Sequence, residues 1–177
     1  MATDTALVII DVQKNLIDEA YQRDEILAHI NTLLAKARVT GTPVIYVQHD
    51  GPKGHGLEVG TDGWQISSII APQESEPIVH KRASDAFYET SLQQELHERH
   101  IRHLVVAGGQ TEYCVDTTVR RATTCSYDVT LVGDAHTTFD CDTLTAAQII
   151  AFYNETLNGF KTDTSAIIVK PTQEIVF

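Results

Sequence analysis

The order of short apolar runs along the chain constrains its fold more than any other feature. Six runs rich in β-branched residues and bounded by turn residues predict strands, at residues 7–12, 44–47, 78–79, 104–107, 129–132 and 166–169. Helical patterns lie between several of these runs. Near-continuous apolar strands that alternate with helices are typical of a parallel sheet covered on both faces, with right-handed crossovers. The pattern therefore predicts a three-layer α/β/α sandwich.

Four segments carry helical periodicity. The clearest one is followed by Gly41 and Pro43, the usual order of a helix stop, and places six apolar residues on one face: Ile26, Leu27, Ile30, Leu33, Leu34 and Ala37. Leu92 and Leu96 mark a second helix, and residues 114–123 and 145–157 predict a third and a fourth. Residues 48–63 contain five glycines and little periodicity, which predicts a long loop that is functional or mobile.

Composition bounds the class of protein. A chain of 177 residues with 42% hydrophobic residues is long enough for one buried core and too short for two ordinary domains, so we expect a single domain over residues 1–177. The formal net charge of −11 opposes binding to nucleic acid or to anionic membranes, because such binding needs clustered Lys and Arg. The apolar run at residues 6–10 is too short for a spanning helix or a signal segment, so a soluble, unprocessed protein is expected.

The cysteines indicate a reducing compartment. Cys114, Cys125 and Cys141 form an odd set without a CxxC spacing, which suggests neither a disulfide framework nor a zinc knuckle. We therefore expect a cytoplasmic protein. Cys125 and Cys141 are interpreted as small buried hydrophobic residues, the commonest role of an unpaired cysteine.

Three polar residues stand where parallel strands are expected to end, and ligands bind beyond the carboxyl ends of such strands. Asp11 ends the first apolar run, Lys81 follows the third, and Cys114 follows the fourth and opens the next helix. Each has an ordinary alternative role: a turn or cap residue for Asp11, a solvated surface cation for Lys81 and a buried hydrophobic residue for Cys114. Their convergence on one crevice favours a shared chemical role.

The chemistry of these three residue types suits a nucleophilic thiol. At a helix N-terminus the free amides and the helix dipole favour a thiolate over a thiol, and they can stabilise an oxyanion. Asp11 can accept the thiol proton as general base, while Lys81 can pair with Asp11 and orient a carbonyl oxygen. Gly108 and Gly109 allow backbone and substrate to approach closely. On this reasoning Asp11→Asn should lower the reactivity of the thiolate.

Three ordered motifs then give the chain a resemblance to a known family. They are LVIIDVQ at residues 7–13, KRASDAF at 81–87 and GGQTEYCV at 108–115, with weaker matches at 118–122, 132–138 and 154–159. Over nearly its whole length the chain resembles the isochorismatase-like cysteine hydrolases, which include nicotinamidases and N-carbamoylsarcosine amidases. The resemblance implies a six-stranded parallel sheet in the order 3-2-1-4-5-6 and a catalytic triad of Asp11, Lys81 and Cys114.

The same resemblance implies further features of the site and of the assembly. It implies a cis peptide bond before Gln110, which turns the amides of Gln110 and Cys114 toward one oxyanion, and a homo-oligomer, dimeric or larger. Relatives that bind a metal carry an Asp-x-His pattern with further histidines, whereas this chain offers Gln48, His49, Asp50 and His55 there. We therefore expect no metal and no other cofactor.

Five residues are candidates for contact with the substrate. Leu16 stands where many relatives carry a pocket phenylalanine, and His49 follows the second strand. Trp64, Phe87 and Tyr113 are the aromatic residues nearest the motifs and could enclose a planar ligand. The alternatives are a hydrogen-bonded structural role for His49 and core packing for the aromatic residues.

The sequence favours hydrolysis of the C–N bond of a small amide or carbamoyl compound through a Cys114 thioester. The only expected substrate is a small molecule. One alternative is isochorismatase-type hydrolysis of a vinyl ether, which proceeds by protonation and needs no thiol. Another is a catalytically silent family member that binds a small ligand.

Overall fold

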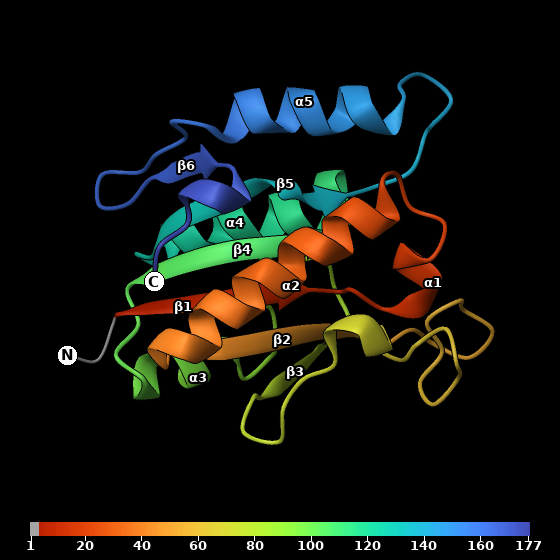
Figure 1. Ribbon diagram of the computed structural model, residues 1–177, viewed down its shortest axis with the longest axis horizontal. Coiled ribbons are helices and arrows are strands. Elements are labelled where there is room, and N and C mark those ends of the chain that lie inside the picture. The colour runs from red at the N-terminus through yellow and green to blue at the C-terminus, as the bar shows by residue number, and fades with distance from the viewer. Residues whose placement is uncertain (1–3) are drawn as a thin grey trace.

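Six parallel strands form one sheet at the centre of the molecule (Figure 1). The computed structural model describes residues 4–177, so residues 1–3 of the expected domain lie outside the described residues. The strands are β1 (Thr5–Ile10), β2 (Val44–His49), β3 (Ile78–Lys81), β4 (His103–Gly109), β5 (Asp128–Thr137) and β6 (Ile167–Lys170). Their order, β3-β2-β1-β4-β5-β6, confirms the predicted sheet, and every neighbouring pair is parallel.

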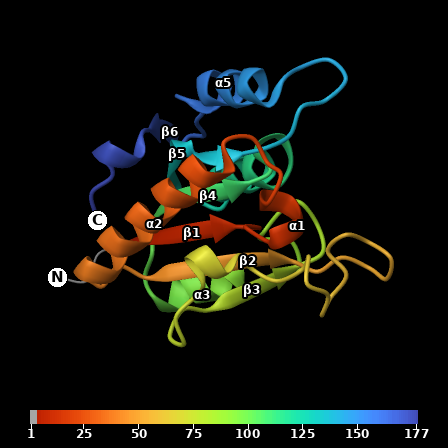
Figure 2. The same ribbon diagram turned by 45° about the vertical axis from the view of Figure 1, so that its right-hand side comes forward.

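Helices cover the sheet on both faces, as Figures 1 and 2 show. They are α1 (Lys14–Ile17), α2 (Arg23–Thr40), α3 (Leu92–Glu98), α4 (Asp116–Thr124) and α5 (Ala146–Leu157), with short helical turns η1 (Ser68–Ile70), η2 (Thr111–Val115) and η3 (Thr172–Glu174). Helix α2 ends at Gly41, whose φ of 73° is the left-handed cap conformation that glycine adopts easily. Helix α5 begins with a capping box between Thr145 and Gln148.

The alternating side chains of the central strands build a separate core on each face. Leu7 and Ile9 of β1 pack with the buried face of α2, whereas Val8 and Ile10 pack on the opposite side with residues of α3 and α4. All four side chains are almost completely buried. A strand buried on both faces cannot slip in register without exposing one of its apolar rows, so the carboxyl ends of the strands are held at fixed positions.

Several element boundaries differ from those expected. Strand β1 ends at Ile10, which leaves Asp11 outside it, and β2 continues to His49, so the long loop starts at Asp50. Strand β5 continues to Thr137. The sequence pattern locates only the apolar part of each strand. The strands of the sheet also include polar residues, because backbone hydrogen bonding does not depend on side-chain polarity. The predicted third helix is preceded by η2, so Cys114 lies inside a helical segment that starts at Thr111.

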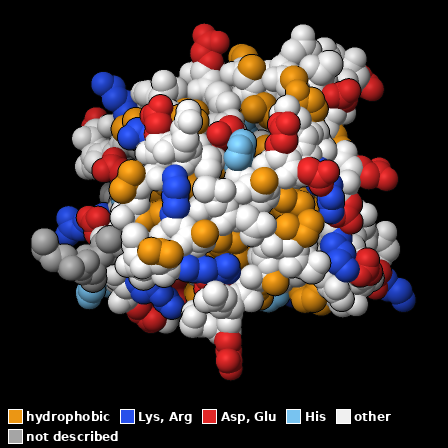
Figure 3. All heavy atoms as spheres, in the orientation of Figure 1, with side chains coloured by type: hydrophobic (Ala, Val, Ile, Leu, Met, Phe, Trp, Pro, Cys, Tyr) orange, Lys and Arg blue, Asp and Glu red, His pale blue; other side chains and the backbone are white. Residues whose placement is uncertain are grey.

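The surface carries charged side chains of both signs around the face that α2 covers (Figure 3). No helix within residues 4–177 is long and apolar enough to cross a membrane. All three cysteines are unpaired, and Cys125 is half-buried against the core. The expectation of a buried Cys141 is wrong: this residue is exposed, because it lies in the turn that precedes α5 rather than in an element that packs on the sheet.

Candidate active site

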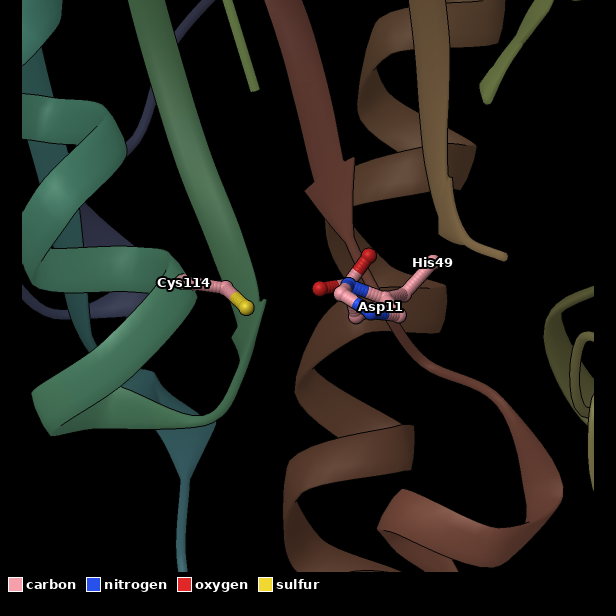
Figure 4. Close-up of side chains that lie close together, drawn as sticks. All are labelled: Asp11, His49 and Cys114. Carbon is pink, nitrogen blue, oxygen red and sulfur yellow. The ribbon is translucent and has the colours of Figure 1, made fainter. Parts of the chain in front are cut away.

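Asp11, Lys81 and Cys114 meet at the carboxyl edge of the sheet. They come from the end of β1, the last position of β3 and the turn η2 that follows β4. The Lys81 Nζ lies 2.7 Å from Asp11 Oδ2 and 3.0 Å from Cys114 Sγ. Figure 4 shows the Cys114 sulfur directed across a short gap toward the Asp11 carboxylate. The expected convergence of these three side chains is therefore present.

Asp11 occupies an unusual backbone position. Its φ of 48° lies in the left-handed region, which non-glycine residues seldom adopt, although Asp tolerates it better than most. Its N–H donates to Val47 O at 2.9 Å, which ties the residue to the end of β2. Asp11 is 1% exposed and does not cap α1, whose N-cap residue is Gln13. A fully buried carboxylate beside an ammonium fits a functional role better than a turn role.

Lys81 contacts both other members of the triad and is not a solvated surface cation. Its side chain is fully buried, and the ammonium donates to Ala83 O at 2.9 Å in addition to its contacts with Asp11 and Cys114. The His49 Nδ1 lies 3.2 Å from the same nitrogen. Because an ammonium can only donate, this His49 nitrogen is the acceptor and the ring proton resides on Nε2.

Burial and charge set the protonation of the three groups. Burial raises the pKa of Cys114 to about 12, and the charge of Asp11 acts in the same direction while Lys81 opposes both. Burial raises the pKa of Asp11 more than Lys81 lowers it. Burial would lower the pKa of Lys81, but the charges of Asp11 and Cys114 outweigh it and the pKa is raised. Lys81 thus holds its proton more tightly than a free lysine does, and the thiol form of Cys114 is favoured over the thiolate.

This protonation differs from the thiolate that the sequence suggested. Cys114 is the fourth residue of η2 and is half-buried, and burial is the largest influence on the pKa of its thiol. The Asp11 carboxylate is buried and takes part in a side-chain hydrogen bond with the Cys114 thiol. A carboxylate that is already hydrogen-bonded to the thiol is a suitable destination for the Cys114 proton.

Asp11, His49 and Cys114 together resemble a metal site in composition. One ligand atom from each lies within 4.8 Å of the other two. The Lys81 ammonium lies against all three atoms and supplies the positive charge at this point. A metal ion bound by this set would have to displace the Lys81 side chain, so the residues fit an ammonium better than a divalent cation.

The turn after β4 presents backbone amides beside the thiol. The peptide bond between Gly109 and Gln110 is cis, and Gln110 O accepts hydrogen bonds from Tyr113 and Val115. Gly108 adopts a φ of 125°, and a Cβ added there would lie 2.0 Å from Ile10 O. Glycine is therefore required at this position because β4 approaches the backbone of β1 too closely for any side chain.

The five candidate substrate contacts lie in different environments. His49 borders the triad, and Leu16 is half-buried in α1. Trp64 donates from Nε1 to Asp50 and stacks on His80 with ring centroids 5.9 Å apart, so its ring lies beside β3. Tyr113 is 56% exposed. Phe87 is 8% exposed and stacks on Tyr127 in the core, as the packing alternative supposed.

Gln13 supports the site although the sequence pattern gave it no role. It is completely buried and accepts from His49 N–H at 2.8 Å. Its amide nitrogen donates to His49 O at 3.0 Å and to Trp64 O at 2.8 Å. Gln13 therefore fixes the end of β2 and the loop that follows. A polar residue two positions after Asp11 was the only sequence signal.

A second supporting network holds the nucleophile turn. His136 is completely buried in β5, and its Nε2 lies 2.9 Å from Asn154 Oδ1 while Asn154 Nδ2 donates to Gly133 O. The Asn154 oxygen can only accept, so Nε2 carries the proton and Nδ1 accepts from Thr111 Oγ1 at 2.8 Å. Burial lowers the pKa of His136, which keeps this ring neutral. The first residue of η2 is thereby anchored to β5 and α5.

Comparisons with known proteins agree with this geometry. The isochorismatase domain matches residues 5–159. The isochorismatase family protein YrdC of Bacillus subtilis (strain 168) is 34% identical over 143 residues, which cover 78% of this chain and 76% of that protein. Streptothricin hydrolase of Streptomyces noursei is 33% identical over 138 residues, which cover 76% of this chain and 55% of that protein. The crystal structure of an isochorismatase from Pseudomonas putida KT2440 has a TM-score of 0.90 at 32% identity, covering 98% of this chain and 90% of that chain. The chain thus belongs to the isochorismatase family.

Proposed function

We propose that this protein is a cysteine hydrolase that cleaves a C–N bond of a small amide or carbamoyl compound through a Cys114 thioester. The observation that carries the proposal is the position of the Lys81 ammonium, 2.7 Å from Asp11 Oδ2 and 3.0 Å from Cys114 Sγ. A thiol beside a base, with the base oriented by a third group, is the arrangement of an activated nucleophile. A hydrolase among the relatives supports the reaction type.

The first half of the proposed reaction forms the thioester. The proton of the Cys114 thiol moves to Asp11 as the sulfur attacks the carbonyl carbon of the substrate. The backbone amides of Gln110 and Cys114 stabilise the negative charge that develops on the carbonyl oxygen. The tetrahedral species then collapses, the C–N bond breaks, and Asp11 returns the proton to the leaving nitrogen, which departs as ammonia or an amine.

The second half restores the enzyme. Asp11 removes a proton from water as the water oxygen attacks the thioester carbonyl, and the same amides stabilise the second oxyanion. When the C–S bond breaks, Cys114 leaves as thiolate beside the Lys81 ammonium and regains its proton from Asp11. Lys81 keeps its charge throughout, because its negative neighbours raise its pKa. The reaction uses only protein groups and water, without a cofactor.

Vinyl ether hydrolysis remains the second candidate, because the Pseudomonas putida relative is an isochorismatase by name. That reaction requires protonation of an enol carbon, for which Asp11 with its raised pKa is a suitable acid. It gives Cys114 no covalent role, however. A requirement for the thiol therefore separates the two reactions.

Cellular location and assembly belong to the same proposal. Three unpaired cysteines support a reducing, cytoplasmic environment. A net charge of −11 supports a small-molecule substrate rather than nucleic acid or an anionic membrane as partner. Exposed apolar side chains, Leu144 and Phe152 on and beside α5 and Tyr113 on η2, support a homo-oligomer.

The decisive experiment measures ammonia release from small amides and carbamoyl compounds, nicotinamide included, by the wild type and by Cys114→Ala. Release that is lost in Cys114→Ala supports the proposal, and release that persists refutes the nucleophile. Cys125→Ala is the matched control, because Cys125 is an unpaired, half-buried cysteine at the far end of α4 and should retain activity. Treatment with EDTA should leave the rate unchanged.

A further inference from the structure

Two cavities at the carboxyl ends of β2 and β3 share one arginine side chain. The first has a volume of about 290 Å³, and Lys81, Arg82 and Glu89 are among its lining residues. The second has a volume of about 380 Å³, and His49, Arg82 and Val59 are among its lining residues. Arg82 therefore lines both cavities. Lys81 borders the first cavity and His49 borders the second. Its place at the end of β3 follows directly from its neighbour in the sequence, the buried Lys81.

Among the residues that the structure describes, Arg82 differs from most arginines in having no acidic partner. Within residues 4–177, five arginines lie within ion-pair distance of a carboxylate: Arg23, Arg38, Arg99, Arg120 and Arg121. Only Arg82 and Arg102 of the described residues do not. Acidic residues outnumber basic ones by 24 to 13, so an arginine without a partner is unexpected, and one that lines two cavities is available to a ligand.

The carboxylates near Arg82 are already engaged. Asp50, which lines both cavities, accepts from Trp64 Nε1 at 2.8 Å and from His80 Nδ1 at 3.0 Å through the same oxygen. Glu89 interacts with the Tyr88 hydroxyl, which raises the pKa of Tyr88. Neither carboxylate lies within ion-pair distance of Arg82 among the described residues. The guanidinium thus keeps its donors free.

We propose that Arg82 is a specificity-determining residue that binds a carboxylate of the substrate while the scissile amide lies at Cys114. A guanidinium matches a carboxylate with two parallel hydrogen bonds, and a protein of net charge −11 repels anions unless a local cation attracts them. His49 supports the same anion, because its Nδ1 faces Lys81 and its Nε2 carries the proton. This inference rests on the proposed hydrolase function and narrows its substrates to anionic amides.

The test compares substrates in which a methyl group replaces the carboxylate: succinamate against butyramide, and N-carbamoylglycine against ethylurea. Arg82→Gln should raise KM for the anionic member of each pair by about ten-fold or more, and should leave kcat/KM for the neutral member within two-fold. Arg102→Gln is the matched control, because it removes the same charge from an exposed arginine at the opposite end of the sheet. It should change neither.

The outcomes separate this inference from the proposed function. Equal effects of Arg82→Gln on both members of a pair, or no effect, overturn the role of Arg82 while the hydrolase function stands. If the wild type releases no ammonia from any of these substrates, the hydrolase function is overturned instead. Binding is then decided by calorimetric titration with succinate: at least ten-fold weaker binding to Arg82→Gln than to Arg102→Gln supports the anion site, and equal binding or none to the wild type overturns it.

Discussion

Lys81 and Asp11 form an ion pair in which neither side chain is exposed, with Nζ 2.7 Å from Oδ2. Removing one member of a buried pair leaves the other charge without compensation. We expect Lys81→Met to lower the free energy of unfolding by about 3 to 5 kcal/mol, measured by urea denaturation. The double variant Asp11→Asn with Lys81→Met should recover much of that stability without recovering activity.

A matched control is Lys53→Met, which removes a lysine from an exposed loop position. It should change the free energy of unfolding by less than about 0.5 kcal/mol. If Lys81→Met proves as stable as Lys53→Met, the buried ion pair is not a determinant of stability. If the double variant is less stable than Lys81→Met, the uncompensated Asp11 charge is not the cause of the loss.

The state of the Cys114 thiol gives a second prediction, in pH dependence. The pKa of Cys114 in the folded protein is raised to about 12 from an ordinary value of 9.0. A raised pKa means that the folded state holds the proton more tightly, so the associated stability is present below pH 9 and is lost as the pH rises toward 12. Alkylation of Cys114 by iodoacetamide should accordingly be slow at neutral pH and accelerate only in alkaline solution.

Asp11→Asn tests the cause of that raised pKa. After burial, the charge of Asp11 is the largest influence that raises the pKa of Cys114. Its removal should move the alkylation profile to lower pH while turnover falls by about 10² to 10⁴, because the general base is lost. The rate at Cys114 is read by peptide mass spectrometry, with exposed Cys141 as an internal reference. An unchanged profile, or one moved to higher pH, contradicts the assignment.

This expected sign is the reverse of the one that follows from the sequence alone. The pattern of strand ends correctly placed Asp11, Lys81 and Cys114 together, because parallel strands end at one edge of the sheet. It gave no measure of how deeply η2 buries the sulfur. Burial depends on packing by segments remote in sequence, and here it is the largest influence on the pKa of Cys114.

The supporting residues show a related limit. Gln13 bonds to residues 36 and 51 positions away, and His136 bonds to Thr111, 25 positions away. Periodicity identifies which residues are apolar and where strands lie, but it does not pair buried polar groups across the fold. Phe87 illustrates the same limit, since its place in the sequence beside Lys81 did not distinguish a pocket aromatic from one that stacks in the core.

Gly108 provides a third prediction because its backbone excludes a side chain. The residue has a φ of 125°, and a Cβ would lie 2.0 Å from Ile10 O on the neighbouring strand. Gly108→Ala must therefore displace β4 from β1 near Asp11, at a cost of about 1 to 3 kcal/mol of stability. Gly109→Ala is the comparison, since its Cβ would lie 3.5 Å from Thr137 O, an ordinary contact. Thermal unfolding should show the larger loss for Gly108→Ala, and equal losses would count against the argument.

Gln13 provides the fourth prediction, since it joins the loop to the site. Gln13→Ala removes three hydrogen bonds and leaves the His49 N–H without its acceptor in the interior, which should cost about 1 to 3 kcal/mol of stability. Because the loop after β2 is then held only by its other contacts, KM should rise more than kcat falls. Gln48→Ala removes a single bond to Trp64 O and should have a smaller effect on both quantities. Gln13, unlike Gln48, also fixes the backbone of His49 beside Lys81, so its loss should raise KM more. If the two variants have the same KM, the role of Gln13 is confined to stability.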